Sequence, residues 1–219
     1  MNKIKLFVIS ALFAAIASVS SAQVSIGISG TGISMDATGS ETQSTETRTE
    51  TLEAIYGSVF VEFDTGMGFS LGIDVLPYTI DGENVTNVRG SGNTGTAVAV
   101  DSGTNRVSVD IENHLTLYGL KNLNDDVYVK FGISEADVLT DEDMGATSTK
   151  YPDATMNGMH LSLGTAFDTG AGVTVRAEAG YSEYDDVSVT GTGGDGTANT
   201  VSAKDLSGPT VKISLVKAF

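Results

Sequence analysis

The sequence predicts an all-β fold, an eight-stranded antiparallel up-and-down transmembrane β-barrel with short periplasmic turns and long external loops. Eight segments alternate apolar and polar residues, and each is near the ~9–11 residues that a tilted membrane strand needs. The connections between them are alternately short and long, and the sequence closes on an alternating segment, 211–219, that ends in Phe219. Because strands in a bilayer cannot leave an edge unpaired, we expect them to close into a ring.

The first 22 residues have the three regions of a signal peptide. Lys3 and Lys5 precede an apolar run at 6–17, and small residues follow at 20–22. We therefore expect cleavage before Gln23, with residues 23–219 forming one outer-membrane barrel domain. A retained helical anchor is the alternative, but the apolar run is short for a bilayer span.

Each predicted strand places its apolar residues on one face, which is expected to be the outer face. Val127, Val129, Phe131 and Ile133 show this alternation within a single strand. The strands are expected at 24–29 (with an extension to 35 left open), 52–63, 69–76, 106–120, 127–134, 158–167, 173–184 and 210–219.

The predicted connections fall into two classes. Three are tight, at 64–68, 121–126 and 168–172, and four are long, at 36–51, 77–105, 135–157 and 185–208. This asymmetry is typical of outer-membrane barrels. We interpret the short apolar run at 97–100 as part of an external ribbon, since a ninth strand would send Phe219 to the wrong side. The Ser/Thr/Gly-rich stretches at 38–51 and 190–200 are expected to be mobile.

Four phenylalanines provide an independent indication of a membrane. Phe63, Phe69, Phe167 and Phe219 all fall on the predicted outer face at the short-turn ends of strands. This is the expected position of the lower aromatic girdle of a membrane barrel. A soluble β-sandwich or a secreted solenoid, the rival folds, would have no reason to gather aromatic residues there.

On this alternation and on the terminal strand with Phe219, the chain resembles the small eight-stranded outer-membrane barrels. This group includes opacity-type proteins, OmpX-like proteins and the barrel half of OmpA. The resemblance implies location in a Gram-negative outer membrane and a role for Phe219 as the signal that the barrel-assembly machinery reads. Lys217 departs from the pattern, which usually has an apolar or aromatic residue there, but a lysine near the interface can snorkel.

Charged residues are expected on the inner face of the barrel. Eight strands enclose a lumen that side chains roughly fill, and charges in such a space must be paired. We therefore expect a salt-bridged plug in place of a wide pore. Projection from the turns also places Phe60 opposite Gly72. The predicted network comprises Glu62, Asp74, Asp110, Glu112, Lys130, Arg176, Glu178 and Lys212.

One group of inward residues suggests catalysis. The projected register places Ser162 opposite Glu178 and His160 diagonal to Glu178, and the spacing of His160 and Ser162 looks like that of outer-membrane lipid A deacylases. Those enzymes need a nucleophile that faces lipid, whereas these side chains are predicted to face the lumen. An interior hydrogen-bond network is the expected alternative, so we assign no catalytic residue.

The chain is strongly acidic, with a net charge of −16, and cleavage would remove Lys3 and Lys5 and no acid. Such a surface repels nucleic acid. The acidic clusters at 141–143 and 185–186, and Glu135 with Asp137, could bind Ca²⁺ or Mg²⁺ weakly and bridge to lipopolysaccharide phosphates, or could form a solvated loop surface. No loop shows Ca²⁺-ligand spacing, so no metal site and no cofactor are assigned.

The sequence therefore predicts a monomeric, non-enzymatic protein with a structural, adhesive or surface-interaction role. Its expected partners are outer-membrane lipid, lipopolysaccharide and, during insertion, the barrel-assembly machinery. A porin-like small-solute channel and a lipid-modifying enzyme remain the alternatives.

Overall fold

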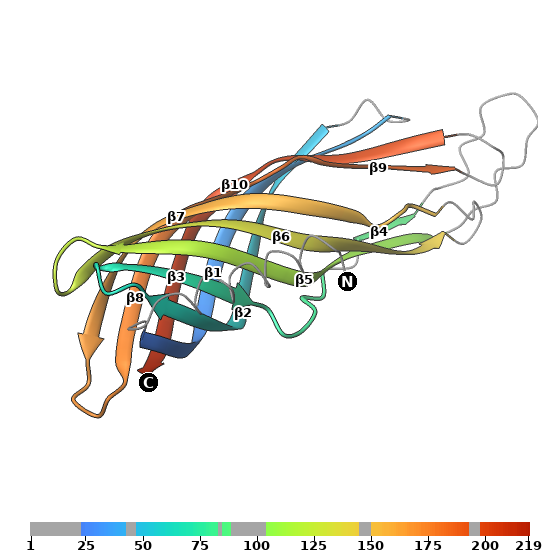
Figure 1. Cartoon of the computed structure of the whole chain (residues 1–219). Helices are drawn as coiled ribbons and strands as arrows, with labels where there is room; N and C mark the ends of the chain where they lie inside the picture. The colour runs from blue at the N-terminus through green and yellow to red at the C-terminus, as the bar shows by residue number, and fades with distance from the viewer. Residues whose placement is uncertain (1–22, 43–46, 83–84, 89–103, 145–149, 193–197) are drawn as a thin grey trace, which may run out of the picture.

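The computed structural model describes residues 23–42, 47–82, 85–88, 104–144, 150–192 and 198–219 (Figure 1). The predicted signal peptide and the run at 97–100 lie outside the described residues.

Eight strands form a closed antiparallel ring, which confirms the predicted architecture. The ring closes between its first and last strands, from Ser25 opposite Ala218 to Glu41 opposite Val201. In ring order the strands are β1 (Gln23–Glu41), β2 (Thr47–Asp64), β3 (Phe69–Val75), β5 (Thr104–Asn122), β6 (Val127–Met144), β7 (Ala154–Asp168), β8 (Thr174–Tyr184) and β10 (Ala198–Ala218).

Two further strands extend the sheet at the long-loop end without changing the ring. β4 (Val85–Val88) follows β3 and pairs with β5, and β9 (Val187–Thr192) follows β8 and pairs with β10. Long strands therefore occupy much of what the sequence predicted as loop. For example, β1 and β2 remain paired up to Ser40 and Thr47, inside the predicted loop 36–51. Apolar alternation is weak in this extension, where the outer face is polar, so the sequence pattern did not reveal these parts of the strands.

The short turns use Asp and Gly in the same way twice. Gly66 N–H donates to Asp64 Oδ1 at 2.8 Å, and Gly170 N–H donates to Asp168 Oδ1 at 2.8 Å. Gly66 and Gly170 have φ of 76° and 74°, a conformation that glycine adopts without steric cost. These two turns hold the short-turn end of the ring together at equivalent places.

A bulge in β5 corrects the prediction for Asp110 and Glu112. Asn113 has φ of 52°, and the pairing of β5 with β6 shifts by one residue between Glu112 and Leu115. An extra residue reverses which side chains face inward. Ile111 consequently packs against an inner cluster, and Asp110 and Glu112 face outward on the same strand.

Neither of these acids belongs to the lumen network. Asp110 Oδ1 accepts from Gly82 N–H at 3.0 Å, and Glu112 Oε1 accepts from the Thr79 hydroxyl at 2.8 Å.

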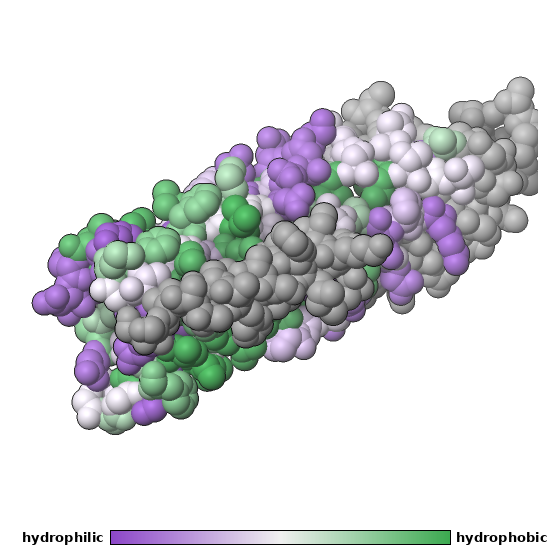
Figure 2. Space-filling model, viewed as in Figure 1, coloured by the Kyte–Doolittle hydropathy of each residue, from purple (hydrophilic) through white to green (hydrophobic). Residues whose placement is uncertain are grey.

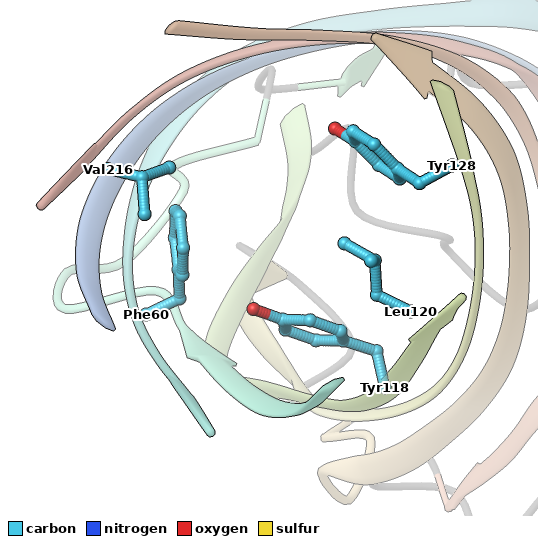
Figure 3. Packing of buried hydrophobic residues seen from close by; sticks show 5 residues of the cluster. All are labelled: Phe60, Tyr118, Leu120, Tyr128 and Val216. Carbon is cyan, nitrogen blue, oxygen red and sulfur yellow. The ribbon is translucent and has the colours of Figure 1, made fainter. Parts of the chain in front are cut away.

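The barrel interior has three layers between its two ends. The lower apolar layer contains Phe60, Tyr118, Leu120, Tyr128 and Val216, which point into the ring from β2, β5, β6 and β10 (Figure 3). The upper apolar layer contains Ala136, Val138, Met156 and Leu206. The inward residues of β6 pass through all three layers, from Tyr128 through Lys130 and Ser134 to Ala136 and Val138. A polar layer thus lies between two apolar ones.

The exterior of the ring is apolar. Figure 2 shows hydrophobic residues gathered toward the short-turn end and more polar residues over the extension. A continuous exposed apolar surface of this kind needs an apolar partner phase. Among the described residues, no helix is long and apolar enough to cross a bilayer. The exposed apolar side chains include Ile26, Ile28, Val59, Phe131, Ile133, Met159, Leu161, Leu163, Val211, Ile213 and Leu215.

The four phenylalanines of the predicted girdle lie at the short-turn end. Phe167 and Phe219 are 56% and 73% exposed, Phe69 is 36% exposed, and Phe63 is half-buried. Phe219 N–H donates to the carbonyl of Val24 at 2.9 Å, which fixes the last residue to the first strand.

Candidate functional site in the barrel interior

The first of three interior ion pairs joins β2 to β8. Arg176 donates from both terminal nitrogens to Glu62, at 2.8 Å to Oε2 and 2.9 Å to Oε1. The Tyr118 hydroxyl donates a third hydrogen bond to Glu62 Oε2 at 3.1 Å. Two parallel hydrogen bonds between a guanidinium and a carboxylate give both strength and a fixed orientation.

The second pair joins β6 to β8. Lys130 Nζ lies 2.8 Å and 2.6 Å from the two oxygens of Glu178. The hydroxyls of Tyr128 and Ser162 also donate to Glu178, at 3.0 Å and 3.1 Å. Both carboxylate oxygens are therefore satisfied, which a buried charge requires. The third pair, Lys212 with Asp74, joins β10 to β3.

Two tyrosines connect the first two ion pairs reciprocally. Tyr118 donates to Glu62, while its ring lies 4.9 Å from Nζ of Lys130 in the other pair. Tyr128 donates to Glu178, while its ring lies 5.5 Å from the guanidinium carbon of Arg176. Each ring thus adds a cation–π contact to one pair and a hydrogen bond to the other. The sequence reasoning missed both tyrosines, although their inward parity was available as a signal.

Glycines on neighbouring strands make room for these rings. A Cβ at Gly72 would overlap the ring of Tyr118, and one at Gly164 would overlap Tyr128. The same is true of Gly27 and Phe60, which are directly opposite each other.

The predicted pairing of Phe60 with Gly72 is wrong, because β2 and β3 pair two residues further along and Glu62 faces Gly72. In each of these three pairs, nevertheless, an aromatic ring packs over a glycine in the barrel interior.

A small cavity of about 40 Å³ lies in the polar layer. A water needs roughly 10–15 Å³ of such volume, so the cavity has room for only a few waters. Its lining includes two of the ion pairs and both histidines of the chain, in the side chains of Asp74, His114, Lys130, His160, Glu178 and Lys212.

The residues of the possible hydrolase group do not form a triad. Ser162 is opposite Gly180, so the predicted register was wrong by two residues, and Ser162 reaches Glu178 diagonally. His160 Nδ1 instead lies 3.0 Å from the Ser182 hydroxyl. The serine and the histidine therefore have separate partners. Met159 and Leu161, their chain neighbours, are exposed on the outer face, as predicted.

The acidic clusters do not form a metal site within the described part of the chain, where no group of three His, Cys, Asp or Glu side chains could hold an ion. Glu135 and Asp137 lie on β6, and the Asn113 side chain donates to Asp137 at 2.9 Å. In the cluster at 141–143, the side chains of residues 142 and 143 lie outside the described residues.

Comparison with solved structures tests the fold. The chain is similar to the outer membrane protein OprG from Pseudomonas aeruginosa, with a TM-score of 0.54, 12% identity and coverage of 89% of this chain and 95% of OprG. It is also similar to a major outer membrane protein from Thermus thermophilus, with a TM-score of 0.51, 10% identity and coverage of 91% and 100%. The chain has the fold of the small outer-membrane β-barrels. No family model and no curated protein matches the sequence.

Proposed function

We propose that the chain is a non-enzymatic outer-membrane β-barrel protein with a closed lumen and a structural, adhesive or surface-interaction role. The observation that carries this proposal is the filling of the interior. Three ion pairs and two clusters of buried apolar side chains occupy the interior, and the described lining leaves a cavity of about 40 Å³. A hydrated solute needs far more room than a few waters.

Several observations support placement in a Gram-negative outer membrane. The predicted signal peptide would export the chain, the exterior of the ring is apolar, and the similar solved structures are outer membrane proteins. In this placement the exterior contacts lipid, and Phe219 serves the barrel-assembly machinery during insertion. The protein would be a monomer, since a closed ring leaves no strand of the spanning region without a partner. Acidic clusters such as Asp185 and Asp186 would meet divalent cations bound to lipopolysaccharide.

Three experiments test this proposal. A membrane barrel should need detergent for solubility and should migrate differently on a denaturing gel before and after boiling. Liposomes that contain the protein should swell no faster in isotonic small sugars than empty liposomes, while a known porin serves as the positive control. Rapid swelling would support a porin-like channel instead. Release of acyl chains from lipopolysaccharide by the pure protein would support a lipid-modifying enzyme.

A further inference from the structure

The four strands β2, β1, β10 and β9 form a sheet that extends the barrel wall beyond the ring (Figure 1). Its inner face continues the upper apolar layer, because Met35, Ala37, Val187 and Ala203 pack there. Alternation then places the residues between them on the outer face. Serines and threonines dominate this outer face.

The register brings these hydroxyls into rows across the sheet. Thr38 is opposite Thr49, Ser40 is opposite both Thr47 and Ser202, and Thr200 is opposite Thr190. We call the set the hydroxyl face; it consists of Thr38, Ser40, Thr47, Thr49, Thr51, Ser188, Thr190, Thr192, Thr200 and Ser202.

Cross-strand hydrogen bonds hold the hydroxyls in place. Hydroxyl pairs lie at 3.1 Å for Thr38 with Thr49, 2.9 Å for Ser188 with Ser202, and 2.7 Å for Thr190 with Thr200. Each such pair uses one O–H and one lone pair, so the other O–H and the remaining lone pairs can bind a partner. The spacing is regular, at ~4.8 Å between strands and ~6.7 Å between successive outer residues of one strand. The face thus presents ordered donors and acceptors together.

The charge of this face narrows the choice of partner. The charged residues among these rows are Asp36, Lys204 and Glu183, which is opposite Ser207, with Glu53 at the lower border and the exposed Asp205 beside Lys204. The face thus carries more acid than base. Arg48 and Glu50 form an exposed ion pair on the opposite face of β2. A phosphate or a polyanion would gain little here, whereas an uncharged polyhydroxylated molecule matches the face.

The position of the hydroxyl face indicates where such a partner lies. The face continues directly from the apolar exterior. Ile55, which is 89% exposed, follows Thr51 by four residues on the same face of β2, a distance of ~13 Å along the strand. On β10, exposed Val211 lies below the row of Ser202 in the same way. The hydroxyl face therefore begins where the apolar belt ends, at the depth of lipid headgroups.

We infer that the hydroxyl face binds the neutral sugars of glycolipid headgroups, such as the core oligosaccharide of lipopolysaccharide, in the leaflet that surrounds the barrel. This inference rests on the proposed membrane placement. The sugars would donate to and accept from the free hydroxyl positions, and bound headgroups would slow the opening of the β1–β2 ribbon.

The experiment measures amide hydrogen exchange of residues 36–41 and 47–52 in nanodiscs of three compositions. One contains lipopolysaccharide with its full core, one contains lipopolysaccharide truncated to lipid A, and one contains phospholipid. We expect about tenfold slower exchange in the first than in the other two, because a ligand that binds only the closed state opposes opening. The triple variant T47V/T49V/T51V should lose this difference. Valine keeps the branched shape and the strand preference of threonine, so this variant should fold.

The matched control is T155V, which changes an exposed threonine on β7, a strand that is not among the four that carry the hydroxyl face, and should keep the full difference. Equal exchange of the wild type in the three discs would overturn the inference, and so would a full difference in the triple variant. Equal protection by free core oligosaccharide added to phospholipid discs would overturn the choice of a membrane glycolipid. A heat-modifiability assay on each disc separates these results from failure to insert, which would overturn the membrane placement and this inference with it.

Discussion

Glu62 on β2 and Arg176 on β8, 114 residues apart in the sequence, are joined across the lumen by two hydrogen bonds of 2.8 Å and 2.9 Å. Both side chains are largely buried, at 4% and 16% exposure. The strands that carry them are not neighbours in the ring, so the pair ties two separate parts of the wall together. Removal of one partner would leave the other charge buried without compensation.

Replacement of Arg176 by alanine should therefore lower the free energy of unfolding by about 3–5 kcal/mol, the usual cost of a broken buried pair. Urea titration of the protein folded in lipid vesicles would measure this. Arg48→Ala is the matched control, because the Arg48–Glu50 pair is exposed and such pairs contribute about 0–1 kcal/mol. Similar losses in the two variants would contradict the idea that the lumen pair holds the wall together.

The reciprocal arrangement of the tyrosines predicts a specific pattern of coupling. Tyr118→Phe removes the hydroxyl but keeps the ring, so its effect should couple to Glu62→Gln and not to Lys130→Met. Tyr118→Leu removes both, and should couple to both substitutions by about 0.5–3 kcal/mol, the range for contacting residues. Double-mutant cycles of urea unfolding provide these numbers. Additive effects of Tyr118→Leu with both partners would show that the two ion pairs are independent.

Two glycines on β1 provide a direct test of the ring packing. A Cβ at Gly27 would overlap the ring of Phe60, whereas nothing lies within 4 Å of a Cβ at Gly30. Gly27→Ala should cost about 1–3 kcal/mol, as overpacking does. Gly30→Ala should be neutral or slightly stabilising, since it reduces the freedom of the unfolded chain. The same unfolding titration compares them, and equal stabilities of the two variants would reject the packing account.

The sequence predicted the eight-stranded ring well because apolar alternation records which face meets lipid. Prediction from alternation failed wherever the backbone departs from regular strand pairing. Ile111 and Leu115 are four residues apart and have the same parity, so nothing in the pattern revealed the extra residue at Asn113 that turns Asp110 and Glu112 outward. A register projected from a turn also carried an error of two residues, which misplaced Phe60 and Ser162.

In the lumen, too, some features could be predicted from the sequence and others could not. Strand alternation sufficed to place Glu62, Asp74, Lys130, Arg176, Glu178 and Lys212 on the inner face, where the structure has them as three ion pairs. Which cation meets which carboxylate could not be deduced, because the pairs join strands that are not neighbours. The connection of the pairs through Tyr118 and Tyr128 depends on side-chain direction, which parity alone does not give.

Deletion of Phe219 should impair assembly in cells more than it impairs folding. Its ring is 73% exposed at the short-turn end, and burial of a Phe side chain in lipid contributes only ~1.5–3 kcal/mol. The truncated protein should therefore accumulate in the periplasm, yet still fold into detergent micelles in vitro. Cell fractionation and a heat-shift gel give the two readouts. Failure to fold in micelles would assign Phe219 a packing role, and normal insertion in cells would remove its proposed role as a signal.

The most direct test of the closed lumen is current recording from the purified protein in planar bilayers. The ion pairs and the two apolar layers predict little or no stable conductance for the wild type. The variant R176A/K130A should show openings or loss of the folded barrel, because Glu62 and Glu178 lose their partners. A large and steady wild-type conductance would contradict the account and would favour a porin-like channel.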